Sequence, residues 1–174
     1  CLSYNSLDSG APVDIEATLI EAAKSFEQDP RLAGLIFSWI KVHGEFVIVE
    51  KLNKLMQRAK RNHEAAAPWI PAIAAFALQQ SWHKWKPLVK AANLPVYLYP
   101  RDVTESSIKL KGAIPWLLDL NFRVPVGGLR IREDDILSPA ELVKLNPQYR
   151  NRYLFGPSWR ADIITAIQSG LKTP

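Results

Sequence analysis

Residues 29–44 read DPRLAGLIFSWIKVHG and give the clearest helix signal in the chain. Asp29 can cap the helix and Pro30 suits its first position, because proline lacks the amide hydrogen that would stay unpaired there. At the other end His43-Gly44 forms a stop signal, and His43 is expected to complement the negative end of the helix dipole. Apolar residues recur between these signals at helical spacing and predict one buried face. They are Leu32, Leu35, Ile36, Trp39 and Ile40.

Similar signals recur through the first half of the chain. Asp14 can cap an amphipathic segment, and the prolines at 68 and 71 suit a helix start better than a helix interior. The short apolar run at 46–49 fits either a strand or the lead-in to the next helix. Besides 30–43, helices are therefore expected at 15–27, 50–60, 65–80 and 81–92.

In the second half the patterning becomes partly extended. Residues 96–99 lie between two prolines and predict a strand, whereas 101–120 are ambiguous between helix and strand. From residue 121 apolar and polar side chains alternate, and Gly127-Gly128 can turn the chain. The sequence therefore predicts a β-hairpin over 122–132.

Two helices are expected near the C-terminus. Ser138 begins a capping box for a short helix that Asn146-Pro147 closes. Ser158 similarly caps a helix over 159–169. Its isoleucines are expected to face inward, and they are Ile163, Ile164 and Ile167.

Together these signals predict a mainly α fold with a small β component. We expect a flexible arm at 1–13, a helical region at 14–93, and an α+β region with the hairpin at 94–174. The chain has 174 residues, 48% of them hydrophobic, which is enough to bury a core. Because Thr173-Pro174 is itself a helix-start signal, the parent polypeptide is expected to continue beyond it.

The charge of the chain is positive and unevenly distributed. The net charge is +5, and residues 61–174 carry 15 basic against 9 acidic side chains, whereas residues 1–60 carry 7 against 8. This balance weakly favours anionic partners. The one cysteine, Cys1, cannot form an internal disulfide, and no apolar run approaches the roughly 20 residues of a membrane span. A cytoplasmic protein is expected, with a lipoprotein anchored through Cys1 as the alternative.

One basic surface is predicted on the helix at 50–60. Lys51, Lys54, Arg58 and Arg61 follow one another at spacings that place them on one helix face, with no acid between them. Such a face can neutralise phosphates and release counterions, which gives salt-dependent binding of nucleic acid. The alternative is an ordinary solvated face of a helix that packs on the core.

A second basic surface is predicted on the hairpin. Pairing across the glycine turn would place Arg123, Arg130 and Arg132 on one face and the apolar residues on the other. A two-stranded basic ribbon can follow a nucleic-acid backbone or serve as the wing beside a recognition helix. The alternative is a solvated hairpin.

Aromatic and basic residues also alternate at 82–86. Single-strand binding proteins use such side chains to stack on bases and to hold the backbone. On a helix, however, Trp82 and Trp85 would be neighbours three positions apart. Packing in the core is therefore the favoured interpretation of both tryptophans.

The sequence contains no motif that predicts catalysis. The three histidines, His43, His63 and His83, lie in different segments, without the close spacing of zinc ligands. Neither a phosphate-binding glycine loop nor a nucleophile elbow is present. The acids at 133–135 are typical of a solvated turn. We therefore expect a non-catalytic protein without a metal or cofactor.

The last third of the chain resembles a known family. The likeness covers residues 121–170 and rests on Gly127–Arg130, Ser138–Leu142, Tyr149–Arg152 and, above all, Gly156–Ile163 (GPSWRADI). These stretches are similar to bacterial regulatory proteins found with nucleotidyltransferases, of the abortive-infection antitoxin type. The resemblance implies a transcription regulator or antitoxin with a winged-helix DNA-binding unit. DNA and a nucleotidyltransferase toxin are the partners that it implies.

Only part of such a winged helix would lie in this sequence. Residues 158–174 correspond to its first helix and the start of its second. The chain would then be mainly the companion domain, which would carry partner binding or dimerisation rather than base readout.

Three functional hypotheses remain open. The first is a regulatory module of a DNA-binding regulator or antitoxin, and the second is a protein-interaction or scaffold domain whose basic surface is incidental. The third is an enzyme whose site is assembled from scattered residues. A homodimer is compatible with the first two.

Overall fold

In the computed structural model, which describes residues 13–64 and 67–170, helices predominate and the sheet consists of two short strands. The first half contains α1 (Ile15–Lys24), α2 (Pro30–His43), η2 (Gly44–Phe46), α3 (Val49–Arg61), α4 (Ile70–Gln79) and η3 (His83–Leu88). The second half contains β1 (Val96–Tyr97), α5 (Arg101–Lys111), α6 (Pro115–Leu118), β2 (Phe122–Arg123), η4 (Glu133–Asp135), α7 (Pro139–Leu145), α8 (Pro147–Phe155) and α9 (Trp159–Gln168). The expectation of a mainly helical chain with a small β component is confirmed. Most of the arm expected at 1–13, and Thr173-Pro174, lie outside the described residues.

The caps inferred for the first two helices are present. The Asp14 carboxylate accepts a hydrogen bond from the Ala17 amide at 3.0 Å, and Asp29 accepts one from the Arg31 amide at 3.1 Å. These bonds satisfy amides that the first turn of a helix leaves unpaired. The first helix ends at Lys24 rather than 27, because the carbonyl of Ser25 accepts from the amides of Gln28 and Asp29 in a turn that leads directly into α2.

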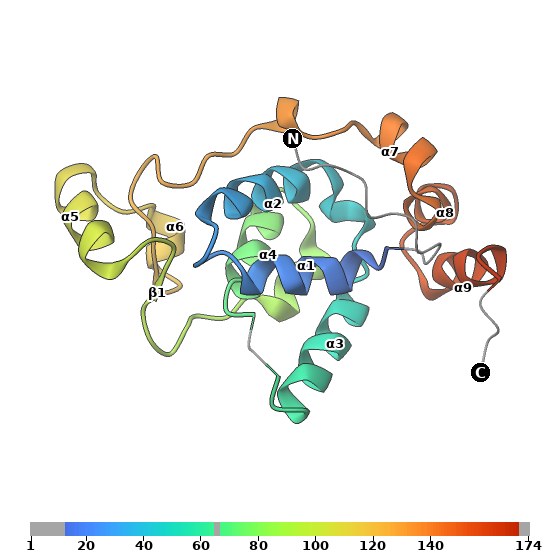
Figure 1. Cartoon of the computed structure of the whole chain (residues 1–174), viewed down its shortest axis with the longest axis horizontal. Coiled ribbons are helices and arrows are strands. Elements are labelled where there is room, and N and C mark those ends of the chain that lie inside the picture. The colour runs from blue at the N-terminus through green and yellow to red at the C-terminus, as the bar shows by residue number, and fades with distance from the viewer. Residues whose placement is uncertain (1–12, 65–66, 171–174) are drawn as a thin grey trace.

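The core lies between α1, α2 and α4, with α1 in front of α4 and α2 above them in Figure 1. The bounds predicted for α2 are confirmed, but its most buried residues are Ala33, Phe37 and Ile40, and Leu35 is exposed. Phe37 packs against Phe76 of α4, with ring centroids 5.3 Å apart. Residues from the second half complete the same core, among them Leu98, Leu117 and Phe122.

The hairpin predicted at 122–132 is not formed. Strand β2 pairs in parallel with β1, with Phe122 opposite Val96, and the Ile114 amide donates to the carbonyl of Val124 at 2.9 Å. The partners of 122–126 therefore precede this segment in the chain. The Gly128 amide donates to the Pro125 carbonyl, and Gly127 has a φ of 79°, as in a type II turn, which splays the flanking strands apart.

Residues 129–132 instead cross the surface of α2. The Arg132 amide donates to the Ser38 hydroxyl at 2.8 Å. At Gly34, a Cβ atom would lie 2.7 Å from the carbonyl oxygen of Arg130, so the absence of a side chain allows this close approach. The apolar residues that were assigned to a hairpin face, Leu129 and Ile131, pack here against the core.

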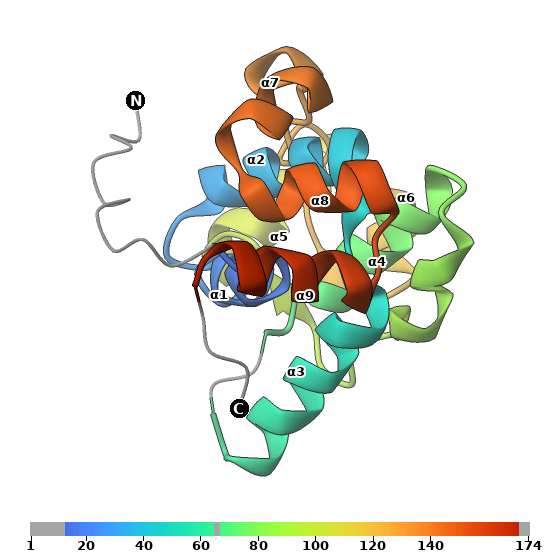
Figure 2. The same ribbon diagram turned by 90° about the vertical axis from the view of Figure 1, so that its right-hand side faces the viewer.

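Near the C-terminus the structure contains a helix that the sequence did not predict. Asn146 ends α7, and its side chain also caps α8 by accepting a hydrogen bond from the Tyr149 amide at 2.9 Å. Figure 2 shows α8 and α9 packed beside each other. The Ser158 side chain makes no capping hydrogen bond to α9.

The inward face of α9 is also different from the prediction. Ile163 and Ile167 are 51% and 64% exposed, whereas Ala161 and Thr165 are buried. The reason is that α9 packs on polar side chains of α8, so that the Asn151 amide donates to the Thr165 hydroxyl at 2.9 Å. Ile163 and Ile167 therefore point to solvent, whereas Ile164 is half-buried.

The ambiguous segments are now assigned. Residues 46–49 lead into α3, the helix expected at 81–92 is the shorter 3₁₀ helix η3, and residues 101–120 form α5 and α6. Among the described residues, no helix combines the length and the apolar character that crossing a bilayer requires.

Candidate functional site

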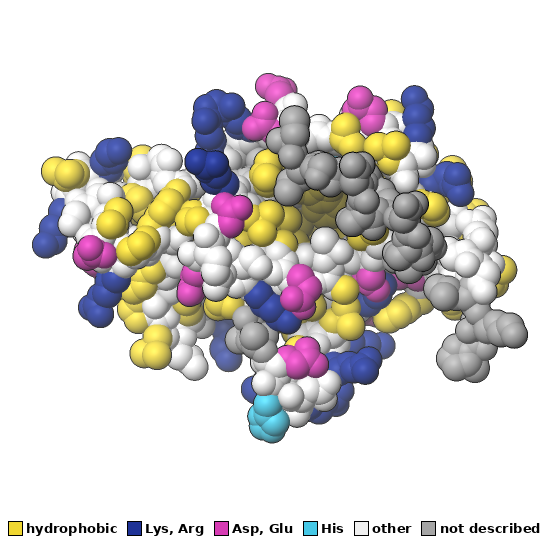
Figure 3. Space-filling view, viewed as in Figure 1, with side chains coloured by type: hydrophobic (Ala, Val, Ile, Leu, Met, Phe, Trp, Pro, Cys, Tyr) yellow, Lys and Arg dark blue, Asp and Glu magenta, His cyan; other side chains and the backbone are white. Residues whose placement is uncertain are grey.

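Helix α3 projects from the body of the protein at the bottom of Figures 1 and 2. Its first turn is held by a hydrogen bond of 2.8 Å from the Ile48 amide to the Glu16 carboxylate, and Leu52 is buried in the core. Further along, the solvent-facing side chains are basic and exposed: Lys54, Arg58, Lys60 and Arg61. Figure 3 shows Lys and Arg side chains gathered around this projecting end.

Three of the four cations predicted to share this face are available to a ligand. Lys54, Arg58 and Arg61 are exposed, and none of them takes part in an ion pair within the described part of the chain. Residues 51–61 contain no acid, so the helix itself supplies no negative charge to this face. We call Lys54, Arg58 and Arg61 the α3 cation row.

Lys51 does not belong to this row. Its ammonium lies 2.8 Å from Asp14, 2.8 Å from Asp162 and 3.3 Å from Glu16, and its side chain is only 12% exposed. Burial alone would lower the pKa of Lys51, but the carboxylates outweigh burial and raise it. Helices distant in the sequence supply these acids, so the spacing on α3 could not reveal them.

The same acids surround a buried arginine. Arg152 lies 2.6 Å from Glu16, with both side chains fully buried, and its Nε donates to Asp162 at 2.8 Å. These bonds, together with those of Lys51, link α1, α3, α8 and α9. Burial would raise the pKa of Asp162, but hydrogen bonds from Arg152 and Lys51 lower it overall. We call Glu16, Lys51, Arg152 and Asp162 the buried charge cluster.

The buried charge cluster is suited to holding helices together. Each charged group in it lies against opposite charge, so neither carboxylate is a free base for a reaction. Arg152 and Asp162 belong to two of the stretches on which the family resemblance rests. No local pattern in the sequence indicated the cluster, because Glu16 and Arg152 are separated by 136 positions.

A cavity of about 570 Å³ opens beside the start of α3, between this helix, η3 and the beginning of α9. Its walls are largely apolar, and Glu50, Asn53, Lys84 and Ser158 contribute polar groups. Trp159, the first residue of α9, also lines the cavity and is 43% exposed. The ammonium of Lys54 lies 5.2 Å from the centroid of the Trp159 ring, so the cavity adjoins the α3 cation row.

Lys84 is held in the wall of this cavity by the backbone. Its ammonium donates to the carbonyl of Val47 at 2.8 Å and to that of Glu45. Burial lowers the pKa of Lys84 to about 8. An ammonium has three donors, so this side chain can still bind one further acceptor.

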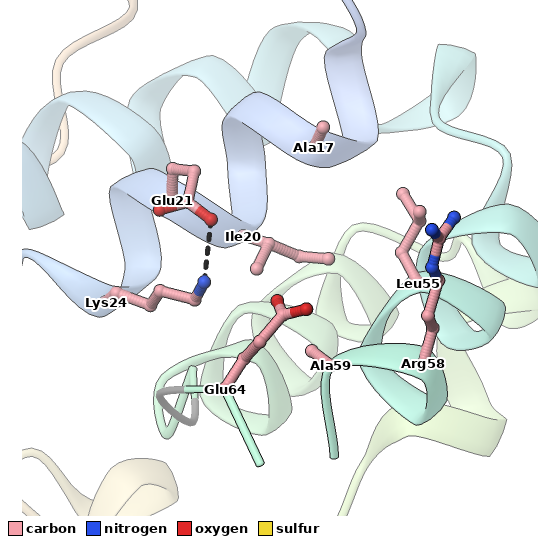
Figure 4. Close-up of a pocket in the computed structure, with 8 residues that line it drawn as sticks. All are labelled: Ala17, Ile20, Glu21, Lys24, Leu55, Arg58, Ala59 and Glu64. Carbon is pink, nitrogen blue, oxygen red and sulfur yellow. Dashed lines mark hydrogen bonds and ion pairs between the residues drawn. The ribbon is translucent and has the colours of Figure 1, made fainter. Parts of the chain in front are cut away.

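A smaller cavity lies on the other side of α3, facing α1 (Figure 4). Glu21 and Glu64 point into it, and Glu21 is paired with Lys24 at 2.6 Å. Lys24 and Arg58 also line it, so two acids and two bases share this small cavity. The cavity beside Trp159 is larger and more apolar, and it is therefore the better candidate for a ligand with an apolar ring.

The arginines expected on the hairpin do not share a face. Arg123 is the second residue of β2, and its Nε is buried, with no partner among the described residues. Arg130 and Arg132 are exposed where the chain passes over α2, close to the acids of η4. This segment lies above α2 in Figure 1, whereas α3 lies below it. The hairpin face that was predicted to hold all three arginines is therefore not formed.

The tryptophans at 82 and 85 pack in or against the core, which confirms the interpretation favoured from the sequence. Trp85 is fully buried and its Nε1 donates to the Gly44 carbonyl at 3.2 Å. The Trp82 ring lies where a side chain at Gly44 would be, since a Cβ there would come within 2.2 Å of it. Lys84 faces the cavity between them and α9.

His43 was expected to complement the negative end of the α2 dipole as a cation. The structure does not place it in that role. It is buried, with Nδ1 2.8 Å from the Tyr149 hydroxyl and Nε2 2.9 Å from the Leu137 carbonyl. Because a carbonyl only accepts, Nε2 donates and Nδ1 can accept from Tyr149, which is the pattern of a neutral ring. Burial lowers the pKa of His43, although the bond to Leu137 acts in the opposite direction.

In the part of the chain that the structure describes, three or more His, Cys, Asp and Glu side chains nowhere gather in a way that could hold a metal ion. No protein-family model, curated protein or solved structure matches the chain, and its function is therefore inferred from its own residues.

Proposed function

We propose that this chain is the regulatory, non-catalytic module of a DNA-binding transcriptional regulator or antitoxin, and that α3 contacts the nucleic-acid backbone. The observation that carries the proposal is the α3 cation row, exposed on a projecting helix and free of ion pairs in the described residues. Lys54 and Arg61 are seven positions apart, which is about 10 Å along a helix. This length corresponds to roughly three steps of 3.4 Å along one DNA strand.

The resemblance of residues 121–170 to antitoxin-type regulators points in the same direction. A non-catalytic role is supported by the buried charge cluster, in which the acids and bases are used in ion pairs between helices. The contact would be to phosphates and independent of sequence. Base readout would then belong to a separate winged-helix unit.

Salt dependence of duplex binding tests this proposal. We expect the double variant Arg58→Glu, Arg61→Glu to weaken binding of a fluorescent DNA duplex and to flatten the plot of log affinity against log salt by about 1.8, because two phosphate contacts are lost. The double variant Arg130→Glu, Arg132→Glu is the matched control. It makes the same change in net charge at exposed positions where the chain crosses α2, away from α3. Equal effects of both double variants would show that binding follows only net charge and would refute the role of α3.

A protein-interaction domain is the second candidate, and the outer face of α9 favours it. Trp159, Ile163 and Ile167 recur every four residues and are exposed, beside exposed Leu154 and Phe155 of α8. Exposed apolar side chains at such spacing on one helix face can form a protein contact. The homodimer is its simplest form.

Sedimentation velocity over a range of concentrations tests this second candidate. If the face joins two copies, the wild-type chain should form dimers as its concentration rises, and Ile163→Asp, Ile167→Asp should remain monomeric. A wild-type protein that is monomeric throughout would contradict the homodimer.

A further inference from the structure

The cavity beside Trp159 has the size and the lining of a site for a small organic group. Its volume of about 570 Å³ falls within the range of roughly 300–1,000 Å³ that is usual for ligand pockets. Most of its wall is apolar, and a few polar side chains converge on it. Such a combination binds a flat apolar ring that carries polar edges.

Trp159 offers such a ring a surface on which to stack. The indole is fixed at the first position of α9, and Asp162, three residues later, holds this helix through Arg152 and Lys51. The helix that carries the ring is therefore fixed before a ligand arrives, which reduces the entropy lost on binding. Single-strand binding proteins use exposed aromatic side chains in this way, because every base has a flat face.

Two cations lie near this ring, where the phosphates that flank a stacked base could bind. The Lys54 ammonium lies over one face of the ring, 5.2 Å from its centroid, so a base would stack on the other face. Lys54 also begins the α3 cation row. Lys84, in the cavity wall, has one donor left after its bonds to Val47 and Glu45. The cavity thus adjoins the start of the α3 cation row through Lys54 and Trp159.

The polar groups from α3 would select among bases. Asn53 can pair with the edge of adenine, and the Glu50 carboxylate can accept from the exocyclic amino group of a base such as cytosine. Thymine and uracil lack that amino group. A carboxylate in the wall also disfavours an isolated phosphate at this position.

We propose that this cavity accepts one unpaired, amino-bearing nucleobase of a single strand, stacked on Trp159, while Lys54 and Lys84 bind the neighbouring phosphates. The inference rests on the proposed function, because it uses the same cation row. It adds that the chain distinguishes a single strand from a duplex.

Fluorescence polarisation with labelled oligo-dC, oligo-dT and a duplex at one salt concentration tests the inference. We expect oligo-dC to bind more tightly than oligo-dT, and Trp159→Leu to weaken oligo-dC by between about fivefold and a hundredfold, the usual effect of one stacked base. Binding of the duplex by the same variant should be unchanged. Ile163→Ala, an exposed position on the same helix outside the cavity, is the control and should bind every probe as the wild type does. Oligo-rC in parallel distinguishes RNA from DNA.

Several outcomes would overturn the inference. Unchanged oligo-dC binding by Trp159→Leu, or equal affinity of the wild type for oligo-dC and oligo-dT, would exclude the base pocket even if the duplex still binds through α3. The proposed function would be refuted by a different result, namely that the double variant Arg58→Glu, Arg61→Glu binds the duplex as the wild type does. If Trp159→Leu fails to fold, Glu50→Ala decides, since it removes the acceptor of the cytosine amino group and should abolish the preference for oligo-dC over oligo-dT.

Discussion

At the scale of single residues, Arg152 stands out because it is fully buried and paired with two carboxylates. The Arg152 guanidinium makes contacts with Glu16 and Asp162 and also donates to the Phe46 carbonyl at 3.1 Å. A buried pair adds little compared with well-packed apolar groups, because both charges lose their water. Removing one partner is much worse, since it leaves the other charge buried alone.

We therefore expect Arg152→Met to lower the free energy of unfolding by about 3–5 kcal/mol. Urea denaturation at neutral pH measures the change. Arg150→Met, at an exposed position of the same helix, is the matched control and should stay within about 0.5 kcal/mol of the wild type. Adding Glu16→Gln to Arg152→Met should restore part of the loss, because it removes the uncompensated charge.

His43 makes stability depend on pH. In the unfolded chain its pKa is about 6.5, whereas burial lowers the pKa of His43 in the folded protein. As the pH falls below about 6.5, the unfolded state takes up a proton that the folded state does not, so the free energy of unfolding decreases. Urea denaturation between neutral pH and pH 5 should show this decrease in the wild type, more steeply than in His43→Gln. A variant with the same slope as the wild type would contradict this assignment, and His83→Gln, at an exposed position, is the control.

At the scale of elements, the sequence predicted what local signals determine. The caps and period of α2 lie within the helix itself, so its bounds were predicted correctly. Asn146 was interpreted only as a stop, although the same side chain starts α8. The faces of α9 were assigned by hydrophobicity. Its burial is instead set by polar partners on the preceding helix α8, such as Asn151, which the hydrophobic pattern of α9 does not reveal.

The path of residues 129–132 across α2 predicts the effect of Gly34→Ala. Alanine in a helix interior normally gains about 1 kcal/mol over glycine. Here the new Cβ would lie 2.7 Å from the backbone oxygen of Arg130, and such overpacking costs about 1–3 kcal/mol. We expect a net loss of stability in thermal denaturation. A stabilised Gly34→Ala variant would show that residues 129–132 do not cross α2 at this point. Ser38→Ala, which removes the acceptor of the Arg132 amide, should also destabilise the protein.

At the scale of the whole molecule, positions that look equivalent in the sequence have different roles. The helical period correctly predicted that Lys54, Arg58 and Arg61 share an exposed face. It could not separate Lys51 from them, because the acids that bind Lys51 come from α1 and α9. Neither could it predict the cavity beside Trp159, whose walls come from three segments that meet only in the folded chain.

Two substitutions with the same change in charge distinguish these roles. Lys51→Met removes charged hydrogen bonds between helices, so it should lower the free energy of unfolding by about 1.5–3 kcal/mol while the salt dependence of duplex binding stays as in the wild type. Arg58→Met should instead leave stability nearly unchanged and alter the salt dependence of duplex binding. Its stability should change by less than about 0.5 kcal/mol, and the slope of log affinity against log salt should flatten by about 0.9, because one phosphate contact is lost. Denaturation and salt titration of both variants provide the four measurements. If Lys51→Met flattened the slope as much as Arg58→Met does, Lys51 would have to leave its carboxylates to bind the nucleic acid, and the division between the buried charge cluster and the α3 cation row would be wrong.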